Sequence, residues 1–167
     1  MKIIRLAPDN AEALRDLRRE ALALHPTAFT GDPEMESRLT VDDWRERITR
    51  NAWFGGMVED ELVAMAVLFI EASTKVKHTG HLASMYVRKS KRATGLADNL
   101  MRAVLDHAAD WVQQVILAIE AGNNQAIKFY ERHGFRPVGK IPRAILVDGQ
   151  YFDELQMFLS LAQRSRC

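Results

Sequence analysis

The residues best suited to chemistry lie in a short predicted helix near the end of the chain. This helix is expected to begin after Asn123, whose side chain can cap it, and to end before Gly134, which can adopt a positive φ. Ala126, Phe129 and Tyr130 fall at i, i+3 and i+4, so the phenol shares a face with apolar residues that must be packed. A phenol held in this way is either a core tyrosine with a satisfied hydroxyl or a positioned proton donor.

A second segment, at residues 87–97, has the composition of an anion site. A predicted strand at residues 81–87 leads into a helix, and a helix start exposes free N–H groups and roughly half a positive charge. The small residues Ala93, Gly95 and Ala97 would let a ligand approach the backbone. Taken alone, the pattern is also typical of a solvated turn. The cations expected around it are Arg88, Lys89, Lys91 and Arg92.

The order of these two motifs resembles the GNAT superfamily of acetyl-CoA-dependent N-acetyltransferases, over nearly the whole chain. In that family a Gln/Arg-x-x-Gly-x-Gly/Ala turn cradles the pyrophosphate of coenzyme A, and Arg92, Gly95 and Ala97 hold its defining places. Many members carry a glycine where Ala93 stands, a change expected to be sterically mild, and a glutamate where His81 stands. The family's later motif is matched by Asn123, Ala126, Phe129, Tyr130, Gly134 and Phe135.

The resemblance implies acetyl-CoA as the cosubstrate and no metal. Main-chain groups of Met85 and Val87 would contact the thioester and the pantetheine arm, while the turn would hold the phosphates. The acceptor would be an amine of a small molecule or peptide. The residues predicted to bind the cosubstrate are Met85, Val87, Arg92, Ala93, Thr94, Gly95, Leu96, Ala97 and Asn123.

N-acetylation needs a base for the amine and an acid for the departing thiolate. Tyr130 suits the second task, because a phenol with a pKa near 10 stays protonated at neutral pH. His81 is predicted to be the base, since an imidazole pKa of roughly 6.5 is suited to neutral proton transfer. Three other interpretations stay open: a structural His81 bonded to a neighbour, a base acting through water, and Glu120 as the base.

Composition narrows the class of protein. With 167 residues, 47% of them hydrophobic, the chain can bury one sizeable core, so residues 1–167 are predicted to form a single domain. Its 23 Lys and Arg residues nearly balance its 22 Asp and Glu residues, which argues against a nucleic-acid-binding surface. Cys167 is the one cysteine, so neither a disulfide framework nor a cysteine metal site is expected.

Other features concern compartment, metal and assembly. Met1 precedes a short strand pattern, and no apolar run is long enough to span a membrane, so we expect a soluble cytoplasmic protein. His78 and His81 fall on opposite faces of an extended segment, which disfavours a metal pair. A homodimer is left open. The remaining histidines are interpreted as helix-end or surface residues and the tryptophans as packing residues: His25, His107, His133, Trp44, Trp53 and Trp111.

The predicted fold class is α/β, a GNAT-like mixed and mostly antiparallel central sheet flanked by helices. Asp9 with Glu12, and Thr40 with Asp43, are predicted to cap the first two helices, with a loop over residues 27–39 between them. The predicted strands span residues 2–6, 53–59, 62–71, 81–87, 115–120, 136–147 and 150–159, the last two forming a hairpin around Asp148-Gly149.

Two other functions compete with acetyl transfer. The alternative from another class is a coenzyme A-binding sensor with little turnover, and a third is a nucleotide-binding protein that prefers ATP. A protonated phenol near the sulfur favours the enzyme. The acceptor pocket is expected to come from residues 26–39, the second helix and the final hairpin, and Thr27-Ala-Phe29 and residues 148–153 resemble a subset of small-amine and amino-acid-derivative acetyltransferases.

Overall fold

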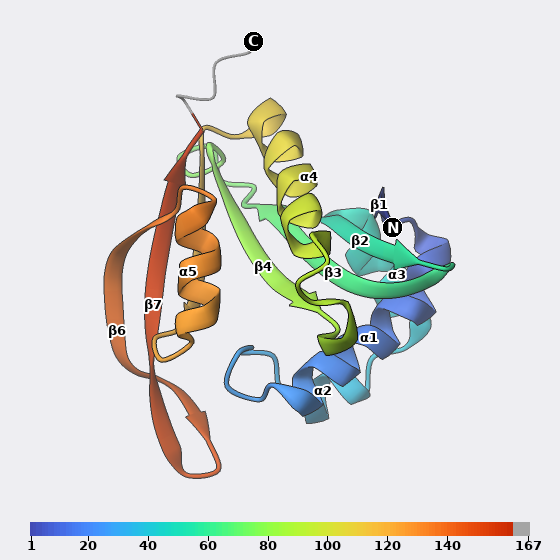
Figure 1. Cartoon of the computed structure of the whole chain (residues 1–167), viewed down its shortest axis with the longest axis horizontal. Coiled ribbons are helices and arrows are strands. Elements are labelled where there is room, and N and C mark those ends of the chain that lie inside the picture. Colours follow the sequence, from blue (N-terminus) through green and yellow to red (C-terminus); the bar gives the residue numbers. More distant parts are fainter. Residues whose placement is uncertain (162–167) are drawn as a thin grey trace.

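The computed structural model describes residues 1–161, which form one seven-stranded sheet in the order β1-β2-β3-β4-β5-β7-β6 (Figure 1). Strands β4 and β5 pair in parallel, and every other neighbouring pair in this part of the chain is antiparallel. The predicted mixed, mostly antiparallel sheet is therefore confirmed. The strands are β1 Lys2–Arg5, β2 Ala52–Val58, β3 Glu61–Ile70, β4 Thr79–Val87, β5 Gln114–Glu120, β6 Arg136–Val147 and β7 Gln150–Ser160.

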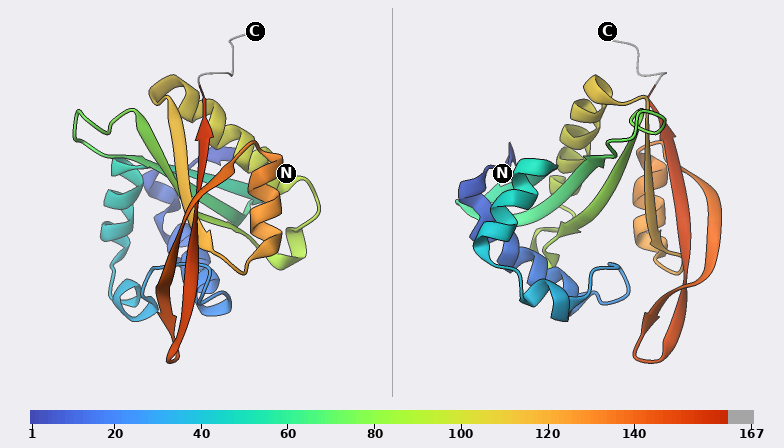
Figure 2. Two further views of the ribbon diagram at one scale, coloured as in Figure 1. Left: turned by 90° about the vertical axis from the view of Figure 1, so that its left-hand side faces the viewer. Right: turned by 180° about the vertical axis from the view of Figure 1, so that it is seen from behind.

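Helices cover both faces of the sheet and divide the core in two. Helices α1 (Ala11–Leu24) and α3 (Val41–Arg50) bury their apolar sides, with Trp44 fully enclosed, against one face of the N-terminal strands. Helices α4 (Leu96–Trp111) and α5 (Asn124–Arg132) pack on the other face (Figure 2). The helices on the two faces of the sheet thus come from different halves of the sequence.

Local signals explain several element boundaries. The predicted capping box of α3 is confirmed, because the Asp43 amide donates to Thr40 Oγ1 and Asp43 accepts from the Thr40 amide. The Asn123 side chain accepts from the Ala126 amide at 3.1 Å and starts α5. Asp148 and Gly149 have φ values of 49° and 77°, as a tight hairpin turn requires.

Three predictions about local structure are wrong. Residues 27–39 contain a short helix, α2 (Pro33–Ser37), capped by the Asp32 side chain; the Asp-Pro helix start was the missed signal. Instead of an Asp9–Glu12 capping box, a 3₁₀ turn at Pro8–Asn10 precedes α1. Trp111 is 67% exposed, so it is not a packing residue like the other two tryptophans.

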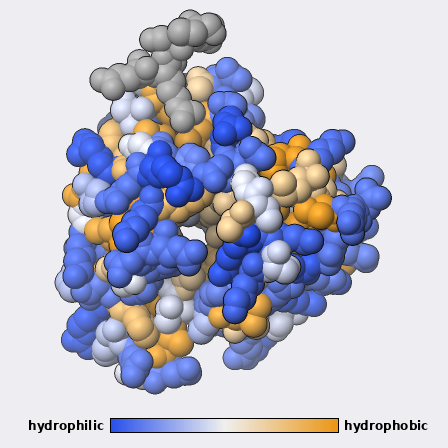
Figure 3. Space-filling view, in the orientation of Figure 1, coloured by the Kyte–Doolittle hydropathy of each residue, from blue (hydrophilic) through white to orange (hydrophobic). Residues whose placement is uncertain are grey.

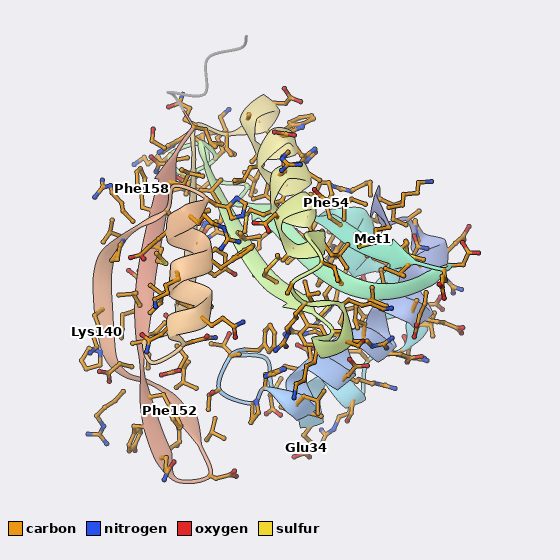
Figure 4. The ribbon with its side chains drawn as sticks, viewed as in Figure 1. Met1, Glu34, Phe54, Lys140, Phe152 and Phe158 are labelled. Carbon is orange, nitrogen blue, oxygen red and sulfur yellow. The ribbon has the colours of Figure 1, made fainter. Side chains whose placement is uncertain are left out.

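The sheet opens between its two parallel strands. The β4–β5 ladder has three pairs, the last joining His81 to Ile116, and in the described residues the strands pair no further. Figure 3 shows an opening at the centre of the molecule between the half with α5 and the half with α1. Lys140 and Phe152 lie on the β6–β7 hairpin on one side of it, and Glu34 on the other (Figure 4). This divergence creates the space in which a site can form.

Two sequence predictions bear on the rest of the chain. No helix in residues 1–161 is both long and apolar enough to cross a membrane. Cys167, the single cysteine, lies outside the described residues.

Candidate active site

A cavity of about 440 Å³, here called the α4 cavity, lies where β4 ends and α4 and α5 begin. The lining comes from the end of β4, the start of α4, the length of α5 and the segment after α1 that contains His25 and Phe29. Most of the residues predicted to bind coenzyme A meet here. The predicted residues that line the α4 cavity are Met85, Val87, Arg92, Ala93, Gly95, Ala97, Asn123 and Tyr130.

The turn into α4 has the backbone that an anion site needs. Gly95 caps the helix with a φ of 82°, and the first helical hydrogen bond runs from the Asn99 amide to the Gly95 carbonyl at 3.0 Å. The amides that precede Asn99 therefore have no intrahelical partner. Ala93 has a φ of 59°, where a Cβ costs roughly 1–2 kcal/mol. The alanine at this place is therefore not sterically mild, contrary to the prediction from sequence.

Arg92 alone among the predicted cations lines the α4 cavity in the described structure. Its Nε donates to the Val87 carbonyl at 3.0 Å, and its Nη2 lies 3.2 Å from His25 Nε2. Arg88 instead binds Glu20 and Glu61, and these carboxylates raise its pKa further. The prediction that four cations surround the turn is therefore wrong for Arg88. Burial, then the Arg92 charge, lowers the pKa of His25 and favours the neutral ring.

Asp98 joins the two helices that border the α4 cavity. Its Oδ1 accepts from Arg132 Nη2 at 2.8 Å and lies 2.9 Å from His133 Nε2. The hydrogen bond from Arg132 is the main cause of the lowered pKa of this carboxyl. His133 is the C-cap residue of α5 and so lies at a helix end, as predicted, and its ring also takes part in this interhelical contact. The contact also offsets a negative charge at a site suited to anions.

Tyr130 is 6% exposed and points its phenol at the α4 cavity. Its ring packs edge-on against Phe129 and Phe135. Burial raises its pKa, so the phenol is protonated at neutral pH. Among the described residues nothing hydrogen-bonds to its hydroxyl, which disagrees with a core tyrosine whose hydroxyl is satisfied. A hydroxyl without a protein partner in a residue that lines a cavity is available to a ligand.

A second cavity of about 410 Å³, here called the hairpin cavity, adjoins the first through Ala28 and Phe29. Part of the predicted acceptor pocket, the loop and the final hairpin, does line it, whereas α3 does not. The residues lining the hairpin cavity include Arg18, Thr30, Phe69, His81, Ser84, Ile116, Ala118, Glu120, Val138, Ile145, Glu154 and Gln156.

His81 lies in the hairpin cavity and not in the α4 cavity. Its ring stacks on Phe69, with centroids 4.7 Å apart, and its Nε2 lies 3.4 Å from Glu71 Oε1. The His81 side chain is 24% exposed. The imidazole is therefore oriented by two neighbours but still open to a ligand entering the hairpin cavity.

An irregularity in β4 lies between the two cavities. The β3–β4 register shifts between the Val67–Ala83 and Met65–Tyr86 pairs, and Ser84 between them has a φ of 54°. Such a bulge turns a main-chain group out of the ladder and re-aims its neighbours. Arg18 Nη1 lies 3.3 Å from Ser84 Oγ, and the same guanidinium binds Glu36 with two hydrogen bonds of 2.9 and 3.0 Å.

Two predicted binding residues lie outside both cavities. The Thr94 hydroxyl donates to the Lys91 carbonyl, and Leu96 is a core residue with 1% exposure. Sequence reasoning missed Phe29, His25, Asp98 and Arg132 as lining residues of the α4 cavity. Phe29 could have been predicted here, because it belongs to the loop that the sequence assigns to the acceptor pocket. Asp98 could also have been found, because it lies in the first turn of α4, three residues after Gly95. His25 and Arg132 carry no signal, because their positions depend on how α1 and α5 dock.

Comparison with known proteins identifies the family. The model of the acetyltransferase (GNAT) family matches residues 12–135, well over half of the chain. An L-methionine sulfoximine/L-methionine sulfone acetyltransferase from Pseudomonas aeruginosa is 34% identical over 79 residues. That match spans 47% of this chain and 46% of the relative, so it covers about half of each protein.

Solved structures share the fold. An acetyltransferase of the GNAT family from Streptococcus pneumoniae superposes with a TM-score of 0.85 at 18% identity, covering 95% of this chain and 98% of the other. The structure of yncA from Salmonella typhimurium with its cofactor acetyl-CoA gives a TM-score of 0.80 at 19% identity, with coverages of 96% and 94%. The chain therefore belongs to the acetyltransferase (GNAT) family.

Proposed function

We propose that this chain transfers the acetyl group of acetyl-CoA to an amine of a small molecule or peptide. The observation that carries the proposal is Tyr130, a buried residue lining the α4 cavity, whose phenol is protonated and whose hydroxyl has no protein partner in the described structure. Pure binding of coenzyme A does not need a proton donor at this place. Family membership and relatives named for acetylating small molecules support the same conclusion.

The residues present fit the phosphates of coenzyme A. The unpaired amides at the start of α4, the positive end of its helix dipole and the Arg92 guanidinium favour an anion. Gly95 leaves open space around its backbone, since an added Cβ would meet no atom within 4 Å. When bound, acetyl-CoA supplies an activated acetyl group, and coenzyme A leaves as the free thiol after the transfer.

The chain's own groups would supply the proton transfers and the orientation. Tyr130 would donate its proton to the departing sulfur, and its raised pKa keeps the phenol protonated until that step. The main chain at Met85, next to the Ser84 bulge, would orient the acetyl carbonyl. The acceptor would arrive through the hairpin cavity, with His81 accepting the proton of the attacking amine.

Thiol release tests the proposal. Purified protein with acetyl-CoA is assayed for free thiol across alkyl amines, polyamines, amino acids and N-terminal peptides. We expect amine-dependent release with at least one of these classes. Tight acetyl-CoA binding without release would favour the sensor, and binding of ATP in preference to coenzyme A would favour a nucleotide-binding protein.

Gly95→Asp is expected to weaken acetyl-CoA binding strongly. The side chain would place a negative charge where the phosphates are proposed to bind, and charge-assisted hydrogen bonds contribute about 1.5–3 kcal/mol each. We therefore expect an affinity loss of about 100-fold or more, measured by calorimetry. Gly95→Asn is the matched control, because asparagine has the same size and similar tolerance of a positive φ. Equal affinities of the folded Asp and Asn variants would contradict the phosphate site.

His81→Gln is expected to remove the acid limb from the pH profile of kcat, since glutamine keeps polarity and approximate size but cannot accept a proton. The loss should be largest near neutrality and smaller at alkaline pH, where more of the amine is already neutral. His81→Glu should restore turnover, because many relatives carry a glutamate there. His107→Gln is the control, since His107 packs on Phe54 away from both cavities. An unchanged acid limb in His81→Gln would make His81 structural and direct attention to Glu120.

A further inference from the structure

The charges that line the hairpin cavity do not balance. Its titratable side chains are Arg18, His81, Glu120 and Glu154. Arg18 is already neutralised by Glu36, with both side chains about nine-tenths buried. His81 has the Glu71 carboxylate 3.4 Å from its Nε2. Every positively ionisable group in the lining is thus engaged, whereas two carboxylates remain.

Glu120 and Glu154 face each other across the β5–β7 ladder as direct partners. Directly opposed residues point to the same face of a sheet, with Cβ atoms about 4.5–5.5 Å apart, and like charges in this arrangement repel. Glu120 Oε1 accepts from the Gly122 amide at 2.7 Å. The Glu154 carboxylate has no hydrogen-bond or ion-pair partner in residues 1–161. The neighbouring hairpin cation Lys140 binds Asp153 instead. A cationic ligand would relieve the repulsion.

The position of the two carboxylates relative to the proposed reaction site is set by the diverging strands. Glu120 lies four residues beyond Ile116 on β5, and Met85 lies four residues beyond His81 on β4, while His81 and Ile116 are the last pair of the ladder. The carboxylates therefore lie across the opening from the proposed carbonyl site. The cavity wall includes the polar Gln156, the direct partner of Ala118 on β7. Its apolar part is formed by Phe29, Ile116, Ala118, Val138 and Ile145.

We propose that the acceptor is an aliphatic diamine or polyamine, whose second ammonium group binds between Glu120 and Glu154. The inference rests on the proposed acetyl transfer and names the acceptor class of the same site. The alkyl chain would lie against the apolar walls, with the reacting amine toward the α4 cavity. An acceptor with a carboxylate near its far end finds no free cation in the described lining and meets two like charges.

Three ligands of equal chain length test the charge directly. Hexylamine, 1,6-diaminohexane and 6-aminohexanoate share one amine and differ at the far end, which is apolar, cationic or anionic. Calorimetry on the protein saturated with coenzyme A is expected to give the diamine an affinity about tenfold or more above hexylamine. The amino acid should bind most weakly. Equal affinity of diamine and hexylamine, tightest binding of the amino acid, or no measurable diamine binding would each overturn the proposal.

Glu154→Gln assigns the effect to the site. Because Glu154 has no protein partner in the described structure, the substitution breaks no contact and removes a repulsion, so thermal stability should be kept or raised. The diamine should lose its advantage over hexylamine, while hexylamine affinity stays constant. Glu131→Gln on the exposed side of α5 removes the same charge outside both cavities and should keep the parent preference. A full diamine preference in Glu154→Gln would overturn the assignment.

Thiol release with the same ligands separates this inference from the proposed function. Release with hexylamine but no diamine preference in either assay would overturn the acceptor class and leave acetyl transfer standing. Preferred diamine binding with no release from any amine would contradict acetyl transfer and leave the binding site standing.

Discussion

Tyr130→Phe is expected to lower kcat by about 10²–10⁴-fold while acetyl-CoA affinity stays nearly constant. The substitution keeps the ring that packs on Phe129 and Phe135 and removes only the proposed proton donor. The lost hydroxyl has no protein partner in residues 1–161, so the free energy of unfolding should not fall. Pre-steady-state thiol release measures the chemical step, and calorimetry measures binding.

Tyr86→Phe is a matched control, because both phenols line the α4 cavity. The Tyr86 hydroxyl donates to Glu20 at 2.8 Å, and burial together with that carboxylate raises its pKa to about 12. This variant should lose stability, by about 1 kcal/mol, and lose less than about tenfold in kcat. Full turnover in Tyr130→Phe, under conditions where chemistry limits the rate, would return Tyr130 to a structural role.

Glu36→Ala is expected to cost about 3–5 kcal/mol in the free energy of unfolding. The change leaves the Arg18 guanidinium buried without its carboxylate, because Arg18 and Glu36 are 7% and 8% exposed. Gly31 approaches this pair so closely that an added Cβ would lie 2.4 Å from Arg18 Nη2. The loop that carries Phe29 into both cavities should therefore loosen as well. Urea denaturation followed by circular dichroism measures the loss.

Glu34→Ala is the control on the same short helix. The Arg38–Glu34 pair has a distance of 2.7 Å, shorter than the buried pair, but its side chains are 74% and 77% exposed. Exposed pairs contribute about 0–1 kcal/mol because water and salt screen them. A loss in Glu36→Ala no larger than in Glu34→Ala would mean that the buried pair does not hold α2 and the loop.

The elements that sequence predicted well are those with local rules. The α5 start at Asn123, the Asp148-Gly149 hairpin and the Thr40–Asp43 cap each depend on a few neighbouring residues, and each is confirmed. The turn at Gly95, which we propose binds the phosphates of coenzyme A, was predictable for a similar reason, since a helix start with small residues creates its own anion site. The sequence predicts these features correctly because they depend on neighbouring residues and not on tertiary packing.

The features that sequence did not predict depend on distant contacts. Arg88 lies within the basic turn, but its guanidinium binds Glu20 on α1 and Glu61 on β3 and does not line the α4 cavity. His81 and Tyr130 were both predicted to be catalytic, and the diverging strands place them in adjoining cavities. The opposed Glu120 and Glu154 are 34 positions apart in sequence, and only the β5–β7 register reveals the pair.

The stoichiometry of the reaction is the most direct test of amine acetylation at the α4 cavity. Free thiol and acetylated amine are quantified in the same sample, by a chromogenic thiol reagent and by mass spectrometry, with 1,6-diaminohexane as acceptor. We expect one acetylated amine per thiol, with release that depends on the amine and falls in Tyr130→Phe. Thiol release that is independent of amine, or the same in Tyr130→Phe, would contradict this expectation.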